Sequence, residues 1–219
     1  MHVVIAGGHG KIGLRLAALL AGRGDTVTGV VRNPDHRAEV ETAGATVAVL
    51  DMESASVDDL AAHLTGADAV VFAAGAGPDS GAQRKDTVDR AAAVLLADAA
   101  ARAGVRRYLL VSSTGVDAEP DPDRGEVWAA YLRAKKAAEE AIAATDLDWT
   151  ILRPGRLTDD PGVGKVLLAP PPVDPAAVTR DDTAAVLAAL LDAPGTEGRI
   201  LELREGGLDV NAAVTEVAG

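Results

Sequence analysis

The sequence predicts an α/β protein: a single doubly wound parallel sheet with helices on both faces. Three observations indicate this fold. The chain opens on a short apolar run, residues 3–6, that ends in a glycine-rich loop. Apolar runs then alternate with segments of helical periodicity, as in consecutive βαβ units. The length of 219 residues suits one domain of this class, spanning residues 1–219.

The elements follow in order from their residues. After the strand at 3–6, a helix is expected at 11–21, because Ile12, Leu16, Leu19 and Leu20 recur at helical spacing. Further strands are expected at 26–31, 46–50, 69–72, 107–111, 149–152 and 200–203. Further helices are expected at 36–43, 56–64, 85–103, 128–144, 181–191 and 211–217.

Two segments lack clear periodicity. The acidic, proline-containing stretch 117–126 is typical of a loop, either a plain surface loop or an active-site lid. The prolines at 170–172 argue against a strand there, because proline cannot donate to a strand ladder. Without a long linker to mark a second domain, residues 153–219 are expected to form a small substrate-side region of the same domain.

Composition excludes several function classes. The 33 acidic and 21 basic residues give a net charge of −12, which argues against a nucleic-acid partner or an anionic membrane surface. With no membrane-length apolar run and no room for a signal peptide before the first strand, a cytoplasmic protein is expected. The chain has no cysteine, and its four histidines lack ligand spacing, so no metal site is expected.

The first loop carries the strongest motif. Gly7-x-x-Gly10-x-x-Gly13 lies between the first strand and the first helix, with Lys11 and Ile12 inside it. Glycines there let the backbone approach a pyrophosphate, whose charge is stabilised by N–H groups at the helix N-terminus. A tight turn without a ligand is the alternative. A Walker A loop is excluded, because Ile12 stands where that motif needs serine or threonine.

The end of the second strand favours NADP(H) over NAD(H). A carboxylate at this point would bind the ribose 2′-hydroxyl of NAD, whereas the guanidinium of Arg32 can pair with a 2′-phosphate. The competing interpretation is that Arg32 is only a solvent-exposed arginine. Because Asp35 lies close by, NAD is the alternative cofactor.

The ends of the third and fourth strands supply further cofactor-binding candidates. Asp51 and Met52 could flank the adenine, although Asp51 could equally cap a turn. Ala73, Ala74 and Gly75 are small enough for a cofactor to cross the carboxyl edge of the sheet above them.

Tyr131 and Lys135 are the candidate catalytic pair. They stand four residues apart, so both project from one helical face. A phenol is a poor proton donor or acceptor at neutral pH, and an adjacent ammonium stabilises its phenolate form. The same lysine could hold ribose hydroxyls. Lys85 and Asp89, at the start of the long helix, are expected to be surface charges.

The joint order of these motifs resembles the short-chain dehydrogenase/reductase superfamily. The glycine motif is followed by Ser112-Ser113 and then by Tyr131-x-x-x-Lys135. The glycine loop, Val31-Arg32, the Val-Ser-Ser-Thr-Gly stretch and Leu152-Arg153-Pro154-Gly155 are similar to the small atypical NAD(P)H-binding group, which includes biliverdin/flavin reductases and NmrA-like proteins.

The resemblance implies a single NAD(P)-binding domain with a Rossmann-like fold, and it implies roles for individual residues. Tyr131 would be the general acid, Lys135 its partner and ribose anchor, and Ser113 the hydroxyl that orients a substrate carbonyl, with Thr114 as the fallback. Ser112 and Pro154 would lie beside the cofactor, with Pro154 lining the nicotinamide pocket.

The implied function is an NADPH-dependent oxidoreductase that reduces a small organic carbonyl, quinone or similar acceptor by hydride transfer. A non-catalytic NADP(H)-binding redox sensor of the NmrA-like kind is the first alternative. A sugar-nucleotide epimerase or dehydratase ranks third, because few residues follow Arg153 to build a substrate subdomain. A homodimer and a monomer both suit this length.

Overall fold

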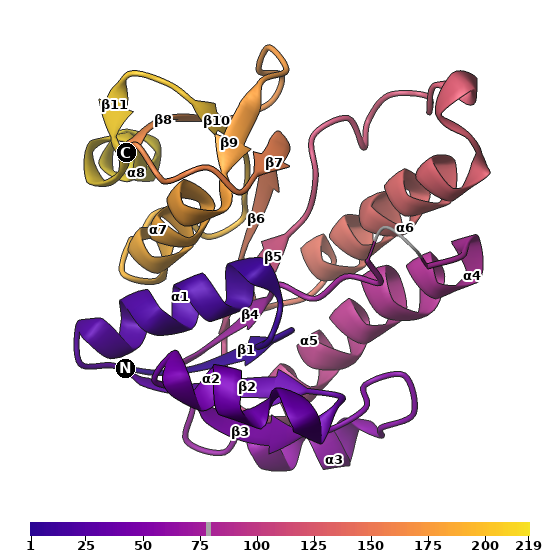
Figure 1. Ribbon diagram of the computed structural model, residues 1–219, viewed down its shortest axis with the longest axis vertical. Helices are drawn as coiled ribbons and strands as arrows, with labels where there is room; N and C mark the ends of the chain where they lie inside the picture. The colour runs from indigo at the N-terminus through magenta and orange to yellow at the C-terminus, as the bar shows by residue number, and fades with distance from the viewer. Residues whose placement is uncertain (78–79) are drawn as a thin grey trace.

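The computed structural model describes residues 1–77 and 80–219 and shows a central sheet with helices on both faces (Figure 1). The strands are β1 (His2–Ala6), β2 (Thr26–Val31), β3 (Thr46–Val49), β4 (Ala69–Phe72), β5 (Arg107–Val111), β6 (Asp148–Pro154), β7 (Arg156–Thr158), β8 (Lys165–Ala169), β9 (Ala177–Thr179), β10 (Arg199–Glu205) and β11 (Leu208–Asp209). Nine of them form one sheet in the order β11-β8-β10-β6-β5-β4-β1-β2-β3, and β7 pairs with β9 separately.

The helices match the predicted ones closely. They are α1 (Lys11–Gly22), α2 (Arg37–Thr42), α3 (Val57–His63), α4 (Ala82–Arg84), α5 (Ala92–Ala103), α6 (Glu126–Ala143), α7 (Arg180–Leu191) and α8 (Val210–Ala218). Short 3-10 turns cover Pro34–His36 and Pro122–Arg124. The predicted helix at 85–103 begins as a π-helix, η2 (Lys85–Ala91), before it continues as α5. Within the described part of the chain, no helix is both long and apolar enough to cross a membrane.

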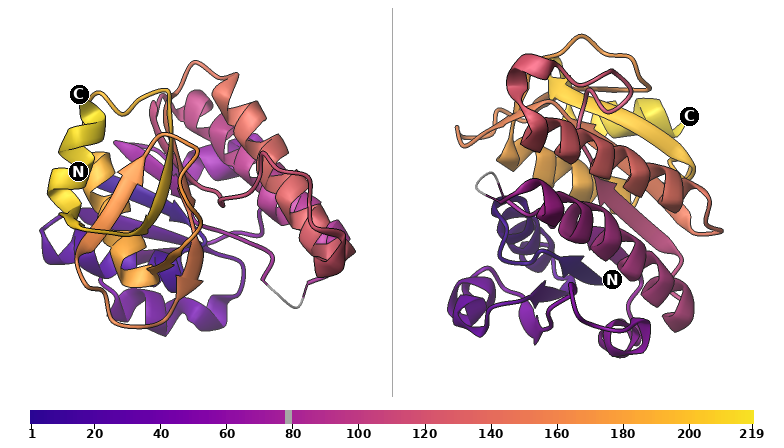
Figure 2. Two further views of the ribbon diagram at one scale, coloured as in Figure 1. Left: turned by 90° about the horizontal axis from the view of Figure 1, so that it is seen from above. Right: turned by 90° about the vertical axis from the view of Figure 1, so that its right-hand side faces the viewer.

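Two cores cover the two faces of the sheet. Successive residues of β1 point to opposite faces, so Ile5 contacts the core beneath α1, α7 and α8, while Val4 contacts the core beneath α3, α5 and α6. A parallel strand buried on both faces needs apolar residues at every position, which explains the continuous apolar runs in the sequence. In Figure 2, α6 lies alongside η2 and α5 over one face.

The sheet is parallel from β3 to β10, and beyond β10 only β8 runs in the opposite direction. β8 runs antiparallel to both β10 and β11. The sequence did not predict β7, β9 or β11, because these strands have only three, three and two residues. It also did not predict β8, which has five residues and lies next to the prolines. β8 ends at Ala169, immediately before the three prolines, so the expectation of no strand at 170–172 agrees with the structure.

The parallel register brings several strand ends to one edge of the sheet. Ala6 of β1 lies opposite Val30 of β2 and Phe72 of β4, and Val111 of β5 lies opposite Leu152 of β6. The segments that follow these residues therefore meet at the carboxyl edge, where ligands bind in open α/β sheets.

Candidate nucleotide-binding and catalytic site

The glycine loop joins β1 to α1 in a conformation that only glycine accommodates at two positions. Gly7 has a φ of +85°, in the left-handed region. A Cβ at Gly13 would lie 2.3 Å from the carbonyl oxygen of Gly7, so the first turn of α1 can pack against the loop only without a side chain there. Gly10 is the N-cap residue of α1 and has no side chain that could accept from the first N–H groups. The first backbone N–H groups of α1 therefore lack a side-chain acceptor from the N-cap residue and can donate hydrogen bonds to a bound anion.

Replacing Gly13 with alanine is expected to destabilise the protein by roughly 1–3 kcal/mol, because backbone atoms must move to admit the methyl group. Nucleotide binding should be lost with the loop geometry. Gly22, at the other end of α1, is the matched control, since a Cβ there meets open space. Chemical denaturation and NADPH titration of the two variants check this expectation, and equal stability of both would contradict it.

A cavity of about 500 Å³ lies at the carboxyl edge beside this loop. Eight residues predicted to bind the cofactor line it: Gly7, Gly10, Arg32, Asp51, Met52, Ala73, Ala74 and Gly75. The other six residues predicted for the cofactor are not among those that line the cavity: Lys11, Ile12, Gly13, Ser112, Lys135 and Pro154. The Asp51 carboxylate accepts the backbone N–H of Glu53 at 3.1 Å, so Asp51 caps a turn while it lines the cavity.

Two arginines converge on one carboxylate in this cavity. Arg32 Nη1 lies 3.0 Å and Arg84 Nη2 lies 2.6 Å from Glu53 Oε2, while Thr87 donates its hydroxyl to Glu53 Oε1 at 2.7 Å. The hydrogen bonds from Arg84 and Thr87 hold the pKa of Glu53 below its ordinary value. Sequence reasoning missed Glu53 and Arg84. Arg84 lies on α4, far from Glu53 in the sequence, so the sequence does not show that the two side chains meet.

The candidate catalytic pair lies on α6. Tyr131 is half-buried, and Lys135 is buried with its Nζ 3.0 Å from the carbonyl oxygen of Val111, at the end of β5. The same Nζ lies 3.4 Å from Asp89 Oδ1 and 5.9 Å from the centre of the Tyr131 ring. The Trp128 ring lies 5.3 Å from that of Tyr131. The ammonium is therefore fixed beside the phenol.

The prediction that Lys85 and Asp89 are surface charges is wrong. Lys85 is 6% exposed and Asp89 1%, because α6 packs over η2 and covers both. Lys85 Nζ donates to the carbonyl oxygen of Gly77 at 2.5 Å and lies 5.6 Å from the centre of the Tyr131 ring. Asp89 accepts the backbone N–H of Ala76 at 3.2 Å. Tyr131 therefore has two buried ammonium groups near it.

The serines at the end of β5 differ in environment. Ser112 is buried, and its hydroxyl has no hydrogen-bond partner among the residues that the structure describes. Ser113 is half-buried and donates to the carbonyl oxygen of Thr114 at 3.1 Å. A buried hydroxyl without a partner suits a site that a bound group completes.

Arg153 fixes the β6 end of the site. It is 1% exposed and donates to both carboxylate oxygens of Glu139 on α6, at 2.9 and 2.5 Å. It also donates to Asp117, which pairs with Lys136. Burial alone would lower the pKa of Arg153, but the carboxylates of Glu139 and Asp117 raise it above its ordinary value. The start of the 117–126 loop is thereby tied to β6.

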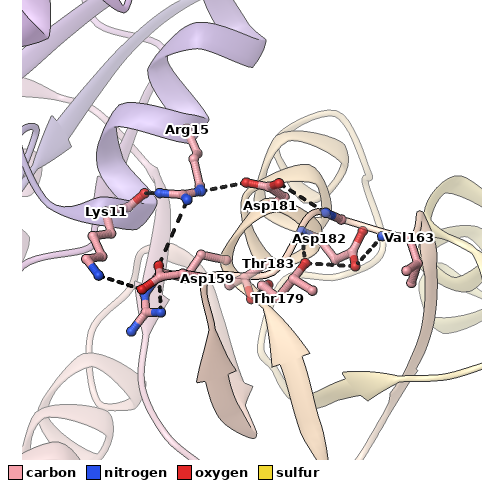
Figure 3. Close-up of polar contacts among 10 residues, drawn as sticks. Lys11, Arg15, Asp159, Val163, Thr179, Asp181, Asp182 and Thr183 are labelled. Atoms are coloured by element: carbon pink, nitrogen blue, oxygen red, sulfur yellow. Dashed lines mark hydrogen bonds and ion pairs between the residues drawn. The ribbon is translucent and has the colours of Figure 1, made fainter.

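The C-terminal region is tied to the glycine loop by a second polar network (Figure 3). Lys11 Nζ lies 2.5 Å from Asp159 Oδ2, and Arg15 Nε lies 2.5 Å from Asp181 Oδ1. Asp159 also pairs with Arg180 at 2.9 Å.

The carboxylates at the start of α7 hold the segment between β7 and β8. Asp181 accepts the N–H of Gly162 at 3.0 Å, and Asp182 accepts those of Val163 and Gly164 at 3.1 and 2.8 Å. Residues 159–164 are therefore held at the N-terminal end of α7, and Asp159 joins them to the first turn of α1.

Comparisons with known proteins place this chain in a family. A family model described as NAD(P)H-binding matches residues 7–194. The uncharacterized sugar epimerase YhfK of Bacillus subtilis (strain 168) is 34% identical, over 99% of this chain and 100% of the relative. A Bacillus halodurans structure named as an NAD-dependent epimerase/dehydratase is 32% identical with a TM-score of 0.89, covering 99% of both chains.

A third comparison comes from a reductase. ChuY, an anaerobillin reductase from Escherichia coli O157:H7, is 25% identical with a TM-score of 0.81, covering 95% of this chain and 99% of that one. This chain belongs to the NAD(P)H-binding family, and the likenesses agree with the atypical short-chain dehydrogenase/reductase group that the motifs resemble. It is an oxidoreductase-like protein with a Rossmann-like fold.

Proposed function

We propose that this protein is an NADPH-dependent reductase of a small organic carbonyl, quinone or similar acceptor. The observation that carries this proposal is the pair of Tyr131 and Lys135. The buried Lys135 ammonium beside the Tyr131 ring contacts the carbonyl oxygen of Val111 and the carboxylate of Asp89, and Asp89 accepts the N–H of Ala76 in the lining of the cavity. A protein that only binds a nucleotide has no need of a buried ammonium held beside a half-exposed phenol.

The residues present fit a nicotinamide dinucleotide. The first turn of α1 after Gly10 would hold the pyrophosphate, and Arg32 would hold the 2′-phosphate. Lys135 would hold ribose hydroxyls, and the unpartnered Ser112 hydroxyl offers a further polar contact near it. The nicotinamide, when bound, supplies the hydride.

The protein's own residues would complete the reduction. Tyr131 donates its hydroxyl proton to the acceptor oxygen that takes up negative charge, and Lys135 stabilises the phenolate left behind. The ammonium of Lys85 adds to that stabilisation. Ser113 orients the acceptor carbonyl, with Thr114 as the alternative hydroxyl.

Calorimetric titration with NADPH and NADH tests the cofactor preference. We expect NADPH to bind the wild-type protein more tightly, and the Arg32→Ala variant to lose about tenfold in NADPH affinity with little change for NADH. Arg37→Ala is the matched control, because Arg37 is as exposed as Arg32 and pairs only with Glu41 among the described residues. Equal affinity of wild type for both cofactors would overturn the preference, and binding of neither would overturn the function.

A sugar-nucleotide epimerase is the second candidate, favoured by the names of YhfK and of the Bacillus halodurans structure. An epimerase would interconvert two sugar nucleotides without net consumption of cofactor, whereas a reductase oxidises one NADPH for each acceptor reduced. Following NADPH absorbance with carbonyls, quinones and flavins, in parallel with sugar-nucleotide conversion, separates the two.

A further inference from the structure

We propose that Glu53 competes with the 2′-phosphate of the cofactor for Arg32 and Arg84, and that these three residues together set the preference between NADP(H) and NAD(H). This inference rests on the proposed function for the identity of the ligand. It adds two residues, Glu53 and Arg84, to the single arginine that the sequence indicates.

The geometry of the three side chains carries the inference. One carboxylate oxygen, Glu53 Oε2, accepts hydrogen bonds from both guanidinium groups, at 3.0 Å from Arg32 and 2.6 Å from Arg84. The three residues come from separate places in the sequence: the end of β2, the turn after β3 and α4. All three line the same cavity. Glu53 therefore lies between two arginines in the part of the cavity where Arg32 is predicted to bind the 2′-phosphate.

The exposures show which groups a ligand can reach. The side chains of Arg32 and Arg84 are 54% and 40% exposed, and that of Glu53 is 25% exposed. The arginines therefore keep accessible N–H donors, whereas the carboxylate is held between them and Thr87. A guanidinium has five N–H donors, so each arginine can contact a phosphate without changing its own position.

Charge decides how the two cofactors differ at this point. Two arginines and one carboxylate leave a net charge of +1, which attracts a 2′-phosphate. The carboxylate repels the same phosphate at close range and must turn away before both arginines can bind it fully. Hydrogen bonds from Arg84 and Thr87 lower the pKa of Glu53, so its carboxylate is ionised at neutral pH and this repulsion operates there.

We therefore expect the two arginines to favour ligands with a 2′-phosphate and Glu53 to reduce that preference. Removing its charge should tighten the binding of any ligand with a 2′-phosphate. Removing Arg84 should weaken the binding of that ligand, even though Arg32 remains. Neither change should alter the binding of a nucleotide that carries only a 5′-phosphate.

Calorimetric titration with 2′,5′-ADP and 5′-AMP tests this directly, because the two probes differ only in the 2′-phosphate. We expect Glu53→Gln to bind 2′,5′-ADP about tenfold more tightly than wild type, and Arg84→Ala to bind it about tenfold more weakly. The affinity for 5′-AMP should stay within about twofold in both variants. Glu41→Gln, which removes an exposed carboxylate paired with Arg37, is the matched control and should change neither affinity.

The outcomes separate this inference from the proposed function. If both probes bind but Glu53→Gln leaves the ratio of their affinities unchanged or lowers it, the role of Glu53 is overturned and the nucleotide site stands. If neither probe binds the wild-type protein, the nucleotide site and this inference are both overturned. Thermal unfolding confirms that each variant is folded, and Arg84→Ala tests the same phosphate contact independently of Glu53.

Discussion

Replacing Tyr131 with phenylalanine is expected to lower kcat by about 100-fold or more, the scale of a lost general acid. The variant keeps the ring that packs against Trp128 and lacks only the hydroxyl that we propose as the proton donor. Affinity for NADPH should change little, because the proposed cofactor contacts lie on the glycine loop, Arg32 and Lys135. The measurement is the rate of NADPH oxidation with an acceptor that the wild-type protein reduces, together with an NADPH titration.

Tyr108 provides the matched control. It is fully buried in β5, where its hydroxyl donates to the carbonyl oxygen of Ala93 at 2.8 Å, away from the site. Tyr108→Phe should cost about 1 kcal/mol of stability and leave turnover unchanged. Full turnover by Tyr131→Phe would exclude Tyr131 as the proton donor. NADPH binding without reduction of any acceptor by the wild-type protein would instead favour the redox sensor.

Replacing Glu139 with glutamine is expected to lower the free energy of unfolding by about 3 kcal/mol, because it leaves the Arg153 guanidinium buried with less compensating charge. Both side chains are 2% exposed and joined by two hydrogen bonds. Urea denaturation measures the loss. Turnover should fall as well, since Arg153 immediately precedes Pro154 and also holds Asp117.

The neighbouring Glu140 is the control for this variant. It lies one position along α6 and is exposed, so Glu140→Gln should change stability by less than about 0.5 kcal/mol. Equal stability of the two variants would show that the buried ion pair contributes no more than a surface charge.

Much of the fold and part of the site could be predicted because they depend on local sequence. The continuous apolar runs of β1 and β4 indicate strands covered on both faces, and the spacing of Ile12, Leu16 and Leu20 indicates the buried side of α1. Strand ends in a parallel sheet meet at one edge, so residues that follow separate strands, such as Gly7, Arg32 and Ala73, were predicted together and line one cavity.

The surroundings of the charged residues could not be predicted in this way. Lys85 and Asp89 are charged residues of the kind that usually lie on the exposed face of a helix. They are buried because α6 packs across η2. The antiparallel pairing of β8 with β10 likewise depends on where the chain returns after β7.

The sequence by itself determined the parallel βαβ units, the glycine loop and the order of serine, tyrosine and lysine, because periodicity and motif spacing are properties of neighbouring residues. Only the tertiary structure decided that Arg84 joins Arg32 at Glu53 and that Lys85 joins Lys135 beside Tyr131. Those contacts join elements distant in the chain, and the free energy of a charge depends on the groups that packing places around it.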